Sequence, residues 1–225
     1  MKTFLSFILA LIFFLGSCKR HAKKENFEGV ILYSITFTPN SGLSDRYVQF
    51  LRSRYGDSMK LFVSHTGDFR QEFPYSDSNG FRSMLSLATK NRQFMQWRNT
   101  DTTYTTNSVT NSLEFVSEEE LPGQNIKGQS CKCYAIAAVE AKGRQPVSLT
   151  YFYPADKEYI NPDLHRNHND FFYNKVIAKM KAPYYKLVMD MGKYSITLTM
   201  ESIQATKVDP DIFKEPTSYP VLEKL

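Results

Sequence analysis

Apolar and polar residues divide the chain into three parts. A largely apolar run extends from Phe4 to Leu15 and is followed by a polar stretch, Lys19 to Asn26. From Phe27 onward, apolar and polar residues alternate, and Ile31, Tyr33, Ile35 and Phe37 share one face of a predicted strand over 27–38. A strand places every second side chain on the same face, so this pattern predicts a sheet with one buried side.

The same alternation recurs along most of the chain. It predicts strands over 59–63, 68–73, 81–88, 93–98, 102–106, 131–139, 147–153 and 194–200. The segment 81–88 also fits helical spacing, and a strand is preferred because another strand follows at hairpin distance. The acidic segment 117–120 with Leu121, Pro122 and Gly123 shows no such alternation and is predicted to be a loop.

Two segments have helical spacing instead. Over 44–55, Val48 and Leu51 share a face, Ser44 can cap the start and Gly56 can close the end. Over 170–181, the residues Phe172, Val176 and Met180 form one stripe, and Pro183 limits the helix. Many strands with two helices predict a single α+β domain built on a large antiparallel sheet.

Composition agrees with this fold class. The chain has 225 residues, enough for one sizeable domain, and its 14 Tyr and 17 Phe favour a sheet. The net charge is +5, but the positive residues are spread out and no basic recognition helix is present. The sequence therefore gives no reason to expect a nucleic-acid partner.

The apolar run ends in Leu15-Gly16-Ser17-Cys18, which resembles the lipobox of bacterial lipoproteins. The run is too short to span a bilayer and has the length of a signal-peptide core. The resemblance implies cleavage before Cys18 and acylation of its thiol. We therefore expect a signal peptide over 1–17, a tether over 18–26 and one domain over 27–225. The alternative is an ordinary signal peptide with an incidental cysteine.

These features predict a location in the envelope of a Gram-negative bacterium. The basic tether can lie on anionic headgroups or act only as a solvated linker. No Asp follows Cys18, the position where one resembles an inner-membrane retention signal. We expect an outer-membrane lipoprotein that faces the periplasm.

The second half of the chain carries a further resemblance. The segment Ile126 to Tyr134 fits the pattern Ile-x-Gly-x-x-Cys-x-x-Tyr, 149–153 is an aromatic strand, and 208–216 is a turn followed by Phe and Pro. The chain in this respect resembles GLPGLI-type and related uncharacterised bacterial lipoproteins, which are similar in fold to LolA and LolB. The segment 181–185 stands where a Gly-Leu-Pro motif would occur, which indicates a sister group.

The resemblance implies a half-open barrel, in which helices partly cover the concave face of a curved antiparallel sheet. In LolA-like carriers that apolar concavity holds acyl chains. The candidate ligand-binding residues of this chain are the aromatic side chains Tyr33, Phe37, Phe94, Tyr151 and Tyr153. For any one of them, packing in a dry core is the favoured alternative.

Cys131 and Cys133 lie two apart on a predicted strand, so both point to one face. At ~3.3 Å per residue their Cα atoms are about 6.6 Å apart, near the upper limit for a disulfide. A strained disulfide, two half-buried thiols and pairing with another chain all remain open.

His165 and His168 are weak candidates for metal ligands, because imidazoles beside carboxylates can bind a transition metal. The alternative is a solvated loop in which Asn167 or Asn169 caps the following helix. The sequence has no nucleophile elbow, metalloprotease motif or Gly-rich phosphate loop, and it predicts no cofactor.

Three functions are consistent with these features. The favoured one is a non-catalytic envelope lipoprotein that binds a lipid or acyl chain and is attached to the membrane by its own lipid. The second is an interaction module with a filled core and an envelope protein as partner. The third is a periplasmic hydrolase or redox protein.

Overall fold

The computed structural model describes residues 25–40, 44–154, 159–217 and 221–223. Within these residues the backbone forms a 12-stranded sheet in the order β12-β6-β5-β4-β3-β2-β1-β11-β10-β9-β8-β7. The strands are β1 (Gly29–Pro39), β2 (Ser58–Val63), β3 (Phe69–Glu72), β4 (Phe81–Leu87), β5 (Arg92–Trp97), β6 (Thr103–Asn107), β7 (Leu113–Ile126), β8 (Gln129–Glu140), β9 (Pro146–Tyr153), β10 (Lys186–Asp190), β11 (Tyr194–Ala205) and β12 (Val221–Glu223). Neighbouring strands are antiparallel except β12, which runs parallel to β6.

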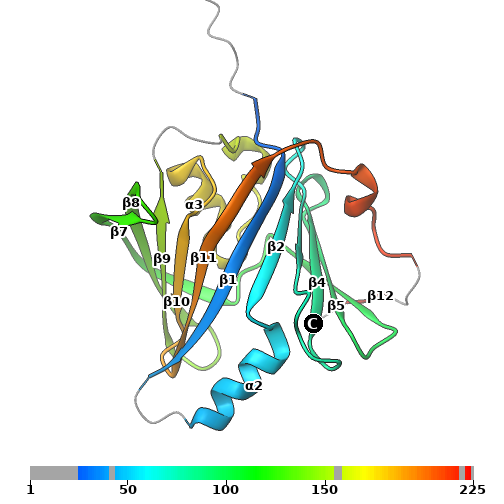
Figure 1. Ribbon diagram of the computed structural model, residues 1–225, viewed down its shortest axis with the longest axis horizontal. Coiled ribbons are helices and arrows are strands. Elements are labelled where there is room, and N and C mark those ends of the chain that lie inside the picture. Colours follow the sequence, from blue (N-terminus) through cyan, green and yellow to red (C-terminus); the bar gives the residue numbers. More distant parts are fainter. Residues whose placement is uncertain (1–24, 41–43, 155–158, 218–220, 224–225) are drawn as a thin grey trace, which may run out of the picture.

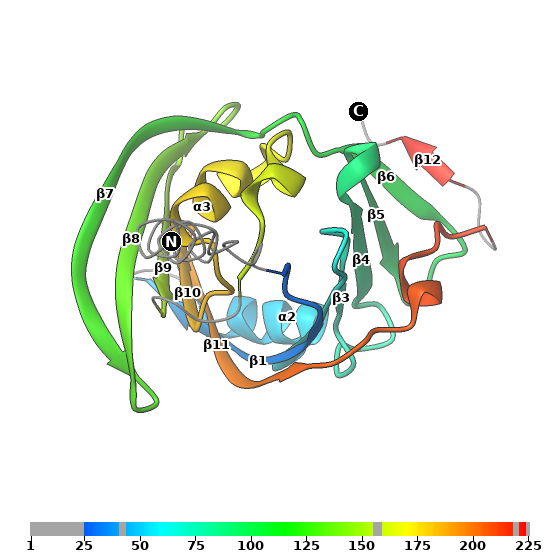
Figure 2. The same ribbon diagram turned by 90° about the horizontal axis from the view of Figure 1, so that it is seen from above.

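The sheet is strongly curved and open (Figure 2). Its two edge strands in the described part of the chain, β7 and β12, do not pair with each other. The helix α3 (Tyr173–Met180) lies inside the curve, and α2 (Asp45–Tyr55) lies at the lower end of the strands (Figures 1 and 2). The predicted fold class, one curved antiparallel sheet with helices on its concave side, is confirmed.

Short 3₁₀ turns complete the described fold. They are η1 (Ala88–Lys90), η2 (Pro162–His165), η3 (Asp170–Phe172) and η4 (Pro210–Phe213). None of the helices in the described ranges is long and apolar enough to cross a membrane.

The central strand β1 pairs with β11 on one side and β2 on the other. Ile31, Tyr33, Ile35 and Phe37 are buried on its concave face, as their alternation predicted. They belong to the main core cluster, which also includes Val176, Ile177 and Met180 of α3.

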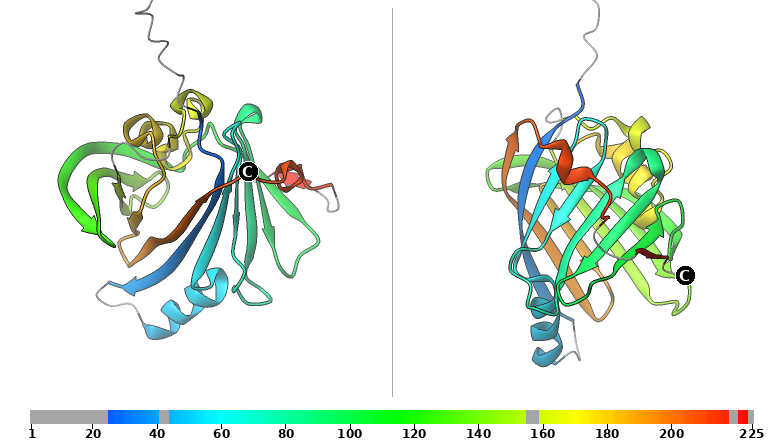
Figure 3. Two further views of the ribbon diagram at one scale, coloured as in Figure 1. Left: turned by 45° about the horizontal axis from the view of Figure 1, so that its top comes forward. Right: turned by 90° about the vertical axis from the view of Figure 1, so that its right-hand side faces the viewer.

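Two smaller apolar clusters lie on the opposite face of the sheet, because their members alternate with inward-facing residues. One consists of Leu85, Leu87 and Phe94, and Phe213 packs against it. The turn η4, which ends at Phe213, lies outside the curve of the sheet (Figure 3, right). The other consists of Cys131, Cys133 and Phe152.

The helix α2 is confirmed, with Val48 and Leu51 buried. Gly56 ends it at a φ of 73°, a left-handed value that glycine adopts readily, and its N–H donates to the carbonyl of Arg52. Ser44 occupies the N-cap position, but its side chain makes no capping hydrogen bond, so that part of the prediction is wrong.

The prediction of a loop over 117–123 is also wrong, because these residues form the middle of β7. β7 is an edge strand whose side chains beyond Leu113 are mostly exposed, so no apolar alternation marks it. Its backbone pairs with β8, and the register shifts between Leu121 and Gln124, where Pro122 and Gly123 lie. Proline is tolerated at an edge strand and at such an irregularity.

The second helix begins later than predicted. η3 precedes it, and Phe171 and Phe172 have φ values of 48° and 56°, which turn the chain before α3 starts at Tyr173. Phe172, Val176 and Met180 are buried as predicted. Asn169 precedes η3 without a side-chain capping bond, and Phe172 rather than an asparagine precedes α3, so the predicted asparagine cap is wrong.

Candidate functional site

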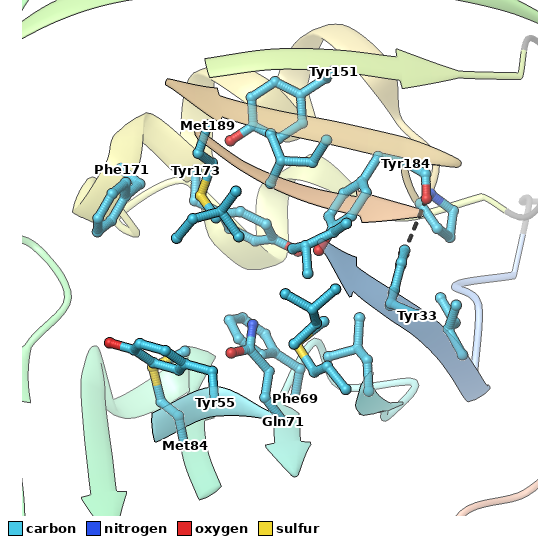
Figure 4. A pocket seen from close by; sticks show the side chains of 18 of the residues that line it. Tyr33, Tyr55, Phe69, Gln71, Met84, Tyr151, Phe171, Tyr173, Tyr184 and Met189 are labelled. Atoms are coloured by element: carbon cyan, nitrogen blue, oxygen red, sulfur yellow. Dashed lines mark hydrogen bonds between the residues drawn. The ribbon is translucent and has the colours of Figure 1, made fainter. Parts of the chain in front are cut away.

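A cavity of about 420 Å³ lies between the concave face of the sheet and α3 (Figure 4). Protein interiors seldom contain voids larger than a water molecule, whereas ligand pockets commonly measure about 300–1,000 Å³. The cavity therefore has the size of a ligand pocket rather than that of a packing defect.

The sheet supplies the apolar wall because alternate residues of several strands face the same space. Ile35 of β1, Leu61 of β2, Leu187 of β10 and Leu198 of β11 all line the cavity. Met84, Met189 and Met191 add flexible thioether side chains, which adapt to ligands of irregular shape.

The opposite wall comes from α3 and the residues on either side of it. Phe171, Tyr173, Ile177, Pro183 and Tyr184 line the cavity from this side.

This wall is tied to the sheet through Tyr33, whose side chain is fully buried. The Tyr33 hydroxyl donates to the backbone carbonyl of Tyr184 at 3.0 Å, and the two ring centroids are 4.8 Å apart (Figure 4). The contact holds the segment after α3 against β1.

Tyr151 and Tyr173 place hydroxyl groups in this largely apolar space. No described residue forms a hydrogen bond with either hydroxyl, and neither oxygen is sealed off from the cavity. Burial raises the pKa of both phenols well above the usual value, so both remain protonated donors.

One part of the wall is more polar. The Gln93 amide donates to an Asp170 carboxylate oxygen at 3.2 Å and lies 3.1 Å from Nε2 of His168. Burial raises the pKa of Asp170, and the bond from Gln93 opposes that shift. All three residues line the cavity.

His165 and His168 are buried among aromatic rings rather than solvated. His168 stacks on Phe69 with ring centroids 5.7 Å apart, and His165 meets Tyr173 edge to face. Burial lowers the pKa of each histidine to about 4, so both are neutral near pH 7. Within the described residues no three His, Cys, Asp or Glu side chains gather as a metal site would require.

The five candidate aromatic residues fall into three places. Tyr33, Phe37 and Tyr151 line the cavity. Tyr153 is buried in the same core but outside the cavity wall, and Phe94 lies on the opposite face of the sheet. Tyr173 and Tyr184 were not candidates, because they belong to a helix and a connecting segment whose approach to the sheet has no periodic signal.

Cys131 and Cys133 are buried together on the face away from the cavity and are thiols in the structure. Burial raises the pKa of Cys133, and the nearby Glu119 acts in the same direction. A raised pKa disfavours the reactive thiolate.

The last residue of the predicted tether, Asn26, contacts the folded domain. Cys18 and the predicted signal peptide lie outside the described residues. Asn26 donates to the carbonyl of His65 at 3.0 Å and accepts from the backbone N–H of Asn161 at 2.7 Å. The chain is thus attached to the domain immediately before Phe27.

Two solved structures resemble this fold weakly. Lipoprotein LppX of Mycobacterium tuberculosis is 12% identical with a TM-score of 0.35, and the match covers 80% of this chain and 90% of LppX. A domain from Vibrio parahaemolyticus, described as an outer-membrane lipoprotein-sorting domain, is 10% identical with a TM-score of 0.26; the match covers 82% and 89%. At these values neither likeness bears on what this chain binds.

No protein-family model matches the chain, and no curated protein matches it. Its relation to the GLPGLI-type lipoproteins therefore stays a prediction.

Proposed function

We propose that this chain is a non-catalytic lipoprotein of the bacterial envelope that binds a hydrophobic ligand, a lipid or an acyl chain. The observation that carries the proposal is the apolar cavity of about 420 Å³ between the sheet and α3. Removal of apolar surface from water is favourable. An apolar ligand that enters the cavity therefore stabilises the complex, both by burying its own apolar surface and by making van der Waals contacts with the cavity wall.

The groups around the cavity suit binding better than catalysis. The histidine in its wall, His168, is neutral and packed against aromatic rings, and the phenols of Tyr151 and Tyr173 are held protonated. Such groups donate hydrogen bonds and fix the orientation of a ligand. This is the usual composition of a binding pocket, in which a few polar groups interrupt an apolar wall.

The anchor is part of the same proposal. Acylation of Cys18 would attach the domain to the membrane through the tether, with the outer membrane as the expected site. A lipid-anchored pocket can receive ligands that are too insoluble to diffuse freely through the periplasm.

The test uses the mature soluble chain with Cys18→Ser, purified from a Gram-negative host and measured by native mass spectrometry. We expect a mass excess that organic solvent removes and that proves to be lipid. A matched pair of variants localises it. Leu61→Trp fills the cavity and should abolish the excess, whereas Lys60→Trp places the same side chain on the exposed face of β2 and should retain it.

A clean mass for the Cys18→Ser chain, unchanged after incubation with phospholipid or acylated peptide, would contradict the proposal for those ligands. An excess that persists in Leu61→Trp would place the ligand elsewhere on the molecule.

A further inference from the structure

The cavity contains hydrogen-bond donors that the protein itself does not use. The hydroxyls of Tyr151 and Tyr173 face the cavity without a partner among the described residues, although Tyr151 is only 5% exposed. In Figure 4 the two rings lie on the same side of the cavity, opposite Tyr55 and Gln71. A buried hydroxyl without a partner is costly, which favours a ligand that supplies one.

The hydroxyls of the cavity tyrosines are not all available to a ligand. Tyr33 also lines the cavity, but its hydroxyl is already bound to the carbonyl of Tyr184. Tyr33 therefore holds the wall together, whereas Tyr151 and Tyr173 leave their donors available. Tyr55, Tyr184 and Tyr194 also line the cavity.

The charge of the wall limits the group that these donors can hold. No Lys or Arg lines the cavity in the described part of the chain, although the whole chain carries a net charge of +5. The ionisable carboxyl in the wall is that of Asp170, and the imidazole of His168 is neutral near pH 7. A carboxylate or phosphate buried here would lack a counterion and would be repelled by an ionised Asp170.

We propose that the ligand buries a neutral hydrogen-bond acceptor, an ester or amide carbonyl, against the hydroxyls of Tyr151 and Tyr173. The cavity then selects neutral acyl compounds over free fatty acids of the same chain length. This inference rests on the proposed function, because it specifies the class of ligand for the same cavity.

The test compares three compounds with the same number of carbons in the chain: methyl dodecanoate, dodecanoate and dodecane. Each competes with a fluorescent hydrophobic probe for the delipidated Cys18→Ser chain at pH 8, where dodecanoate is ionised. We expect the ester to bind at least about tenfold more tightly than the carboxylate. Two neutral hydrogen bonds should also place the ester about tenfold ahead of dodecane.

Variants assign the selectivity to the two hydroxyls. The double variant Tyr151→Phe/Tyr173→Phe keeps both rings and should lose most of the preference for the ester over dodecane, with dodecane affinity unchanged. Tyr153→Phe is the matched control, because it removes a buried tyrosine hydroxyl from a residue outside the cavity wall and should retain the preference. Circular dichroism spectra and melting temperatures verify that each variant is folded.

The outcomes separate the two claims. If none of the compounds displaces the probe, the proposed function fails and this inference fails with it. If dodecanoate binds as tightly as the ester, the cavity binds acyl chains but the neutral-ligand inference is wrong. If the preference for the ester survives in the double variant, the carbonyl does not bind at the hydroxyls of Tyr151 and Tyr173.

Discussion

At the scale of single residues, His165 and His168 should make the stability of the fold depend on pH. Their exposed fractions are only 2% and 4%. Burial lowers the pKa of each imidazole from 6.5 to about 4, and for His168 the neighbouring His165 adds to the shift. Each Nδ1 atom is enclosed without a hydrogen-bond partner in the described residues. Protonation would therefore place a charge where little compensates it.

We predict that the free energy of unfolding decreases as the pH falls from about 6.5 to about 4. Between pH 6.5 and 4 the histidines are protonated in the unfolded chain but remain neutral in the folded chain. The unfolded state therefore binds more protons, and stability rises with pH. Each histidine should contribute on the order of 3 kcal/mol of stability, which is present above pH 6.5 and lost as the pH approaches 4. Urea unfolding at several pH values measures it.

The control for this prediction is His65, whose side chain is 70% exposed. His65→Gln should keep the pH dependence, and His168→Gln should reduce it by about half. Asp170 acts in the opposite direction, because its raised pKa gives stability at low pH that is lost as the pH rises through that pKa. A free energy of unfolding that stays constant between pH 6.5 and 4 would show that the histidines are not buried as described.

Residue-scale prediction from sequence depended on periodicity. Ile31, Tyr33, Ile35 and Phe37 could be assigned to the concave face because a strand alternates its side chains. Periodicity also assigned Tyr151 but could not tell which face of β5 carries Phe94, because both Gln93 and Phe94 are buried there. Tyr173 and Tyr184 depend on how α3 turns back into the curve, which no local pattern encodes.

At the scale of elements, α3 is attached to the rest of the molecule by two kinds of contact. Its inner side buries Val176, Ile177 and Met180 in the main core. Its outer side carries Lys175 and Lys179, which form ion pairs with Glu118 and Glu120 of the edge strand β7. Buried apolar contacts are worth several times as much as exposed ion pairs.

We predict that Met180→Ala destabilises the chain by roughly 2–4 kcal/mol, because it leaves a gap in the core. Lys179→Ala, one position earlier in the same helix, should cost much less, because that ion pair is solvent-exposed. Urea unfolding of the two variants provides the comparison. Equal losses would mean that the ion pairs with β7, rather than the core contacts, hold α3 in place.

The strand β7 shows why some elements escape prediction from sequence. Most of its side chains are exposed, and what holds it in the sheet is backbone pairing with β8. A pattern of apolar residues reports burial, so it detects β1 and β9, whose buried faces alternate, and misses an edge strand. The short β10 was missed for another reason: only Leu187 of its five residues is buried, although β9 and β11 flank it.

At the scale of the whole molecule, the ligand cavity and the membrane attachment lie in different parts of the chain. The cavity is lined by residues of β1 to β5, β9 to β11 and α3, whereas the proposed anchor, Cys18, precedes the described domain. Asn26 attaches the start of the domain to the His65 turn and to Asn161, at the end of the strands opposite α2 (Figure 1). The two functions should therefore be separable by mutation.

We predict that Cys18→Ser releases the protein from the membrane fraction without changing what the cavity binds. Leu61→Trp in the full chain should do the reverse, because the thiol that receives the lipid is intact and the cavity is filled. Fractionation of the envelope measures the first property. The melting temperature with and without added methyl dodecanoate measures the second, since a ligand that binds only the folded state raises it by mass action. A Cys18→Ser chain that stays in the membrane fraction would show that another surface, rather than the N-terminal lipid, attaches the protein.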